Sequence, residues 1–147
     1  MSGVFGYCGE RADRPILDLV ERMGQQIRHL PHQQLDHIAI GATVGLGRLH
    51  IGKLNRQPQP VRSQDGRVWL CLTGEFYVQR EQRRTLEHAG LLAPDSDDAV
   101  FALALYLHAG AAGIAELNGA FTCSIWDERD GTLWLINDRY GLYPHYY

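Results

Sequence analysis

Strand-like segments occur in groups along this chain, with helix-like segments gathered between them. Aliphatic and β-branched residues alternate through 37–51 and run through 67–73, which predicts strands at both places. A second group covers 120–127 and 132–138, and the short turn between these two contains Gly131, as in a hairpin. Such grouping favours antiparallel sheets with helices on their outer faces, an α+β class, over a parallel βαβ architecture.

Two more strands are expected towards the ends of the chain. The segment SGVFGYC at 2–8 predicts a buried strand, and a final strand is expected to begin near Tyr143. A helix follows the first strand, with Asp13 as its cap and Pro15 in its first turn. Its apolar residues recur every three or four positions and form one stripe that would cover a sheet: Ile16, Val20, Met23, Ile27 and Leu30.

Two helices are expected in the middle of the chain. The first covers 79–89 and ends at Gly90. The second covers 97–109, with Ser96 as its cap and Gly110 at its end.

Composition and charge argue against several classes of protein. The chain has 147 residues, which suits one compact domain, and its 16 glycines are dispersed and predict many turns. Its 14 basic and 17 acidic side chains give a net charge of −3, and no basic cluster indicates nucleic-acid binding. The most apolar stretch, 99–115, contains His108 and two glycines, so it predicts a buried helix and not a membrane span.

Neither the cysteines nor the histidines predict a metal site. Cys8, Cys71 and Cys123 are odd in number and lack CxxC spacing, which favours reduced thiols in the core of a cytoplasmic protein. The three histidines within 29–37 have no accompanying cysteine or carboxylate pair. The N-terminus also lacks the basic and apolar regions of a secretory signal.

Ser2 stands directly after the initiating methionine. Removal of Met1 would leave a hydroxyl beside a free α-amine. An α-amine has a pKa of about 8, so it can act as a base for its own side chain. Ser2 is therefore a candidate N-terminal nucleophile.

The chain resembles the glutaminase domain of the asparagine synthetase family, a class II glutamine amidotransferase domain with the N-terminal nucleophile hydrolase fold. Five pieces carry the resemblance, in the order and at the separations found in the family: SGVFG at 2–6, GRLHIGKLNRQPQP at 47–60, LTGEFY at 72–77, DSDDAVFALAL at 95–105, and the pair LNGAFTCSIWD at 117–127 and NDRYGLYPHYY at 137–147. The resemblance implies an αββα sandwich of two antiparallel sheets between helical layers.

The resemblance also implies roles for individual residues. Arg48 falls where the family binds the α-carboxylate of glutamine, and Asp97 falls where an acidic residue receives the α-ammonium. The backbone amide of Gly74 matches an oxyanion donor, and Glu75 matches a residue that lines the glutamine pocket.

Two departures from the family pattern concern catalysis. Ser2 replaces the family's nucleophilic cysteine, and a hydroxyl needs stronger base assistance than a thiol. Thr73 replaces an asparagine whose side-chain amide donates to the oxyanion, although Thr73 remains a candidate donor with a shorter reach. The segment at 28–33 also departs from the family's glutamine loop. These changes predict weak or absent glutaminase activity.

Three hypotheses for function follow. The first is a degenerate glutaminase-type domain kept for structure or docking beside an ATP-dependent amide-forming domain. The second is an active amidohydrolase that uses Ser2, and the third is a non-enzymatic amino-acid sensor or docking module. We expect no cofactor in this domain, with ATP and Mg bound only by a separate synthetase domain.

The expected partners follow from the same resemblance. They are glutamine or a related amino acid, and a synthetase domain or partner chain in a homo- or hetero-oligomer. Residues 1–147 are expected to form one amidotransferase-like domain that is C-terminally incomplete relative to the family, with the synthetase domain absent from this chain.

Overall fold

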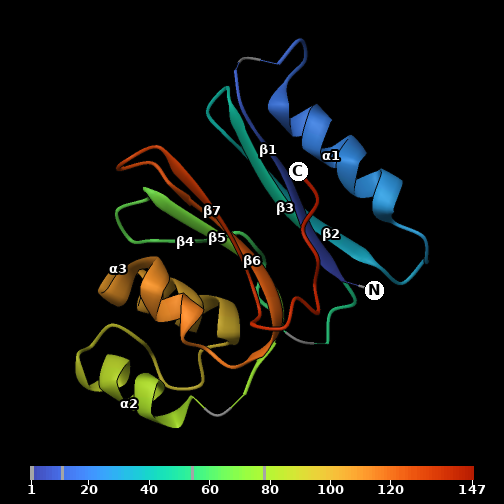
Figure 1. Ribbon diagram of the computed structural model, residues 1–147. Helices are drawn as coiled ribbons and strands as arrows, with labels where there is room; N and C mark the ends of the chain where they lie inside the picture. The colour runs from blue at the N-terminus through green and yellow to red at the C-terminus, as the bar shows by residue number, and fades with distance from the viewer. Residues whose placement is uncertain (1, 11, 54, 78) are drawn as a thin grey trace.

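Four layers make up the computed structural model, which describes residues 2–10, 12–53, 55–77 and 79–147 (Figure 1). Helix α1 (Ile16–Ile27) covers the outer face of one sheet. Helix α3 (Asp98–Ala115) packs on the outer face of the other sheet, with α2 (Arg80–His88) beside it. The two sheets face each other between these helical layers, so the predicted αββα sandwich is confirmed.

Sheet A has three antiparallel strands in the order β1-β3-β2. They are β1 (Gly3–Cys8), β2 (Gln34–Ile40) and β3 (Val44–His50). The central strand β3 is buried along its whole length. Strand β1 lies at an edge and is only partly covered, so the prediction of a buried strand at 2–8 is wrong in that respect.

Sheet B has four antiparallel strands in the order β4-β5-β6-β7. They are β4 (Val61–Arg62), β5 (Val68–Phe76), β6 (Gly119–Asp127) and β7 (Thr132–Asn137). Strand β5 is buried from Val68 to Thr73, as its apolar run predicts, because α3 covers one face and sheet A the other. The predicted hairpin around Gly131 is also confirmed.

The side chains between the two sheets are apolar at one end of the layer and polar at the other. Its apolar part is a small cluster of Val44, Leu46, Trp69 and Cys71, whereas the larger core lies between sheet B and α3. Side chains on one face of a strand alternate, so Arg48 and His50 continue the row of Leu46, and Thr73 continues the row of Cys71. Both rows therefore turn from apolar to polar at the same end of the sandwich.

The helix ends differ in detail from the sequence predictions. Helix α1 begins after Pro15 without a side-chain cap, so Asp13 does not cap it, and it ends before Leu30. Asp97, not Ser96, caps α3, because its carboxylate accepts from the Val100 amide. The Ser96 hydroxyl instead donates to the carbonyl of Ala93 at 2.6 Å.

Helix α3 has the length and hydropathy of a membrane span, but it packs as the core helix of sheet B. Its residues 101–106 are buried. The predicted end at Gly110 corresponds to a break in the helix, where φ is 68° and ψ is −167°, before a last helical segment reaches Ala115.

Two further predictions fail at surface positions. No strand forms near Tyr143, where the chain is irregular up to Tyr147. Cys8 is exposed on the edge strand, so only Cys71 and Cys123 are core thiols. Burial raises the pKa of Cys123 to about 12 and that of Cys71 further, which keeps both thiols protonated and unreactive.

The contact between α1 and β3 depends on a glycine. A Cβ atom at Gly45 would lie 2.7 Å from Cγ2 of Ile16 and 2.9 Å from Cγ2 of Val20. We expect Gly45→Ala to lower the free energy of unfolding by about 1–3 kcal/mol in urea titrations, because the helix must move away from the sheet. Gly3→Ala is the matched control, since its Cβ would meet nothing within 4 Å. Equal stability of the two variants would contradict this account.

Candidate functional site

A cavity of about 430 Å³ lies at the polar end of the layer between the sheets. It brings together Ser2, Arg48, Thr73 and Gly74 of the residues that the sequence singles out. The predicted residues Glu75 and Asp97 are not among the lining residues that the structure describes. The other lining residues are His50, Ile51, Lys53, Asn55, Leu72 and Tyr143.

Ser2, Thr73 and Gly74 come from the two facing sheets. Ser2 directly precedes β1, whereas Thr73 is buried on β5. Gly74 has a φ of +97°, and a Cβ there would lie 2.0 Å from the carbonyl oxygen of Ala120, so only glycine fits. The cavity therefore has the hydroxyl groups of Ser2 and Thr73 and a close-packed strand backbone at Gly74 where the sequence predicts nucleophile and oxyanion chemistry.

The C-terminal segment covers part of this cavity. Tyr143 is one of its lining residues. The His145 ring contacts the hydroxyl of Thr122, which pairs with Thr73 across β5 and β6. The segment that the sequence predicts as a strand thus contributes Tyr143 to the cavity wall and contacts β6 through His145.

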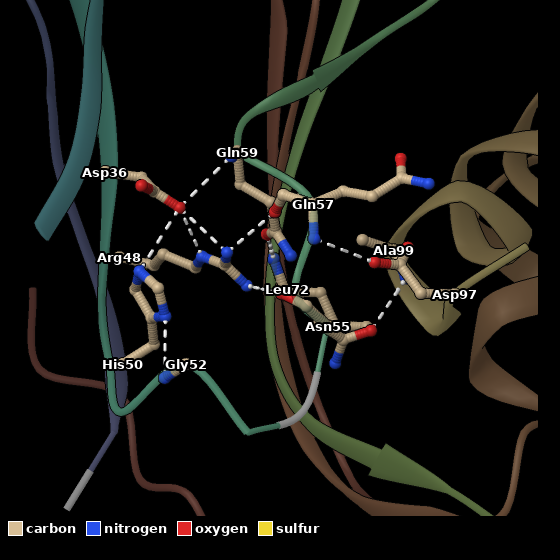
Figure 2. A network of polar contacts seen from close by, with 10 residues as sticks. All are labelled: Asp36, Arg48, His50, Gly52, Asn55, Gln57, Gln59, Leu72, Asp97 and Ala99. Carbon is tan, nitrogen blue, oxygen red and sulfur yellow. Dashed lines mark hydrogen bonds and ion pairs between the residues drawn. The ribbon is translucent and has the colours of Figure 1, made fainter. Parts of the chain in front are cut away.

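Arg48 is the largest fully buried side chain of the cavity wall, with 1% of its surface exposed. Its Nε donates to Oδ2 of Asp36 at 2.8 Å, and its Nη2 lies 2.8 Å from the same oxygen (Figure 2). Nη1 donates to the carbonyl of Asn55 at 2.7 Å, and Nη2 donates to that of Gln57 at 2.8 Å. The guanidinium is thus neutralised and hydrogen-bonded within the protein.

His50 lies beside this ion pair. Its Nδ1 accepts from the Gly52 amide at 3.1 Å, which assigns the ring proton of neutral His50 to Nε2, 3.5 Å from Oδ2 of Asp36 (Figure 2). Burial and the positive charge of Arg48 lower the pKa of His50, although Asp36 opposes the shift. The imidazole is therefore neutral at pH 7 with its lone pair already occupied.

Asn55 is a site residue that sequence reasoning missed. Its Nδ2 donates to the carbonyl of Gly74 at 3.0 Å, and its Oδ1 accepts from the Ala99 amide at 3.2 Å. It has a φ of 50°, in the left-handed region that asparagine tolerates better than most residues. An asparagine within a Pro- and Gln-rich loop is the one feature of the sequence that could have indicated it. Its role could not be predicted because its partners lie 19 and 44 residues away in the chain.

Asp97 and Glu75 do not line the cavity. One oxygen of the Asp97 carboxylate accepts from the Val100 amide as the cap of α3, and the other accepts from the Gln57 amide at 3.3 Å. Glu75 is exposed near the end of β5. Their predicted contacts with glutamine stay predictions.

Metal-binding side chains do not gather in this cavity. Within the described residues, no group of three or more His, Cys, Asp and Glu could hold a metal ion.

Comparison with known proteins agrees with this architecture. The glutamine amidotransferase domain family matches residues 1–147. This chain belongs to that family. Two relatives are asparagine synthetases [glutamine-hydrolyzing] of Bacillus subtilis (strain 168). Number 1 is 31% identical over 132 residues, covering 88% of this chain and 21% of the relative, and number 2 is 26% identical over 148 residues, covering 100% and 20%.

A solved structure shares the fold of this amidotransferase domain. Glutamine phosphoribosylpyrophosphate amidotransferase from B. subtilis superposes with a TM-score of 0.58 at 16% identity, over 87% of this chain and 35% of that one. The chain spans about a fifth of the length of the asparagine synthetases it matches.

The lowered pKa of His50 makes stability depend on pH. Below about pH 6.5 the unfolded chain binds a proton at this residue more readily than the folded domain does. The free energy of unfolding should therefore fall as the pH falls from 7.5 to 5.5, and less steeply in His50→Gln. Urea titrations at both pH values measure this. His32→Gln, at an exposed loop position, is the control, and an identical decrease in wild type and His50→Gln would contradict the prediction.

Proposed function

We propose that this chain is the glutaminase-type domain of an asparagine-synthetase-like, ATP-dependent amide-forming enzyme, with weak or no glutamine hydrolysis of its own. In this proposal the domain is retained for structure or for docking with a synthetase domain, in the same or a partner chain. ATP and Mg would bind only to the synthetase domain. The amidotransferase family and its asparagine synthetase relatives support this assignment.

The observation that carries the proposal is that the cavity has hydroxyl side chains at the two positions where the family has a thiol and an amide. Ser2 and Thr73 line it together, and the described cysteines lie elsewhere, on the edge of sheet A and in the core. A serine needs a base that takes its proton, and the nearby His50 already accepts from the Gly52 amide through Nδ1. A threonine hydroxyl also reaches less far than an asparagine amide, and one lost oxyanion donor costs about 10²- to 10³-fold in turnover.

The second candidate is an active amidohydrolase that uses Ser2. One observation favours it, because Ser2, Thr73 and Gly74 line the same cavity as the hypothesis requires. In this alternative the α-amine of processed Ser2 would act as the base, and water would release the acyl group after ammonia has left. Met1, whose removal the mechanism needs, lies outside the described residues.

Intact mass and ammonia release separate the two candidates. The mass shows whether Met1 is removed. Ammonia release is then measured with about 20 mM glutamine, above the usual range of KM values. We expect wild type to release ammonia no faster than Ser2→Ala. Faster release by processed wild type, lost in Ser2→Ala, would overturn the proposal of a degenerate site.

A gain-of-function variant tests the same proposal from the other side. Ser2→Cys combined with Thr73→Asn returns a thiol nucleophile and an amide donor to the cavity. We expect its kcat for glutamine to exceed that of wild type by about 100-fold, with a KM that remains high. Thr73→Asn alone, which keeps the serine, is the control. A double variant no faster than this control would show that the serine at position 2 does not limit hydrolysis.

A further inference from the structure

We infer that Asp36 takes the place of a substrate carboxylate at Arg48, so that the cavity does not hold a free α-amino acid through this arginine. The inference rests on the proposed function, because it concerns the substrate class of the same cavity. Asp36 was not among the candidate residues from the sequence.

The donors of Arg48 are almost fully used inside the protein. A guanidinium has five N–H groups. Nε and Nη2 both contact Oδ2 of Asp36, and the carbonyls of Asn55 and Gln57 take one donor each. One N–H on Nη1 and one on Nη2 make no further hydrogen bond among the described residues, but Nη2 already lies 2.8 Å from the charged Oδ2 of Asp36. Bidentate recognition of a substrate carboxylate needs two parallel donors that no other carboxylate occupies.

Strand register places the aspartate, so its position does not depend on a mobile loop. Asp36 on β2 is the direct cross-strand partner of Arg48 on β3. Directly opposed residues in an antiparallel pair have side chains on the same face. Here that face is the one towards sheet B, and the two charges meet within the sandwich.

The same carboxylate oxygen has one further hydrogen-bond donor and one further neighbour. The Gln59 amide donates to Oδ2 of Asp36 at 3.1 Å, and Nε2 of His50 lies 3.5 Å from it. The Asp36 carboxylate is already fixed in the fold, so it loses no translational freedom when it contacts Arg48. A free substrate loses translational freedom when its carboxylate binds, and this loss weakens its binding. An external carboxylate would therefore have to displace a competitor that is always present.

No other cationic side chain of the described cavity lining can bind a substrate carboxylate in place of Arg48. Lys53 is its other cationic lining residue among those described, and it is exposed to solvent. The ligand class that fits is therefore a primary amide without a free α-carboxylate. Glutamine without its carboxylate group, 4-aminobutanamide, is the simplest member of this class.

Chemical rescue tests the role of Asp36 without any need for turnover. Asp36→Ala should lower the melting temperature by roughly 10 °C, because it leaves a buried cation unpaired. Sodium acetate should then raise it in a saturable manner, by more than sodium chloride at equal ionic strength. Wild type should show no acetate-specific shift.

Asp127→Ala is the matched control, because Asp127 also pairs with an arginine, but Arg129 is 41% exposed and lies at the far hairpin. An acetate effect on Asp36→Ala no larger than that on Asp127→Ala would overturn the inference.

A second variant covers the case in which Asp36→Ala does not fold. Asp36→Asn keeps the volume and an acceptor oxygen but removes the charge. At about 10 mM, glutamine should raise its melting temperature more than 4-aminobutanamide does, whereas 4-aminobutanamide should raise that of wild type more than glutamine does. A glutamine-specific shift in wild type would overturn the inference. Ammonia release by wild type would instead overturn the proposed function. The inference about Asp36 would still be decided by the melting temperatures alone.

Discussion

The buried guanidinium of Arg48 is the interaction on which this end of the sandwich depends. It joins three consecutive segments of the chain, because its donors reach from β3 to Asp36 on β2 and to two carbonyls of the loop after β3. A cation removed from water is costly unless it is paired and hydrogen-bonded. The loop at 55–59 thus owes its course to a charge that must be satisfied, and this loop contributes Asn55 to the cavity wall.

Most of the fold could be predicted from the sequence because its signals are local. Alternation indicates strand structure in 37–51, and the apolar segments at 67–73, 120–127 and 132–138 indicate β5, β6 and β7. The resemblance implies how the layers stack. The errors occur where a tertiary contact outweighs local preference. Ser96 is a good capping residue, but Asp97 caps α3. The apolar start of the chain becomes an edge strand because, among the described strands, only β3 pairs with it.

The site could be predicted only in part, for a similar reason. The family resemblance implies Arg48, Thr73 and Gly74 as site residues, and the cavity does bring them together with Ser2. The aspartate opposite Arg48 has no local signal, because its position depends on the hairpin register between β2 and β3. Asn55 likewise has partners on β5 and α3 that only the folded chain reveals.

The close approach of α1 to β3 has a consequence for how this domain can vary. The space at position 45 is filled by the side chains of Ile16 and Val20. These three positions therefore share one volume, and a larger residue at 45 can be accommodated only by smaller ones on the helix. Sequence change in this layer must come in compensating sets, whereas single substitutions are tolerated on the exposed face of α1.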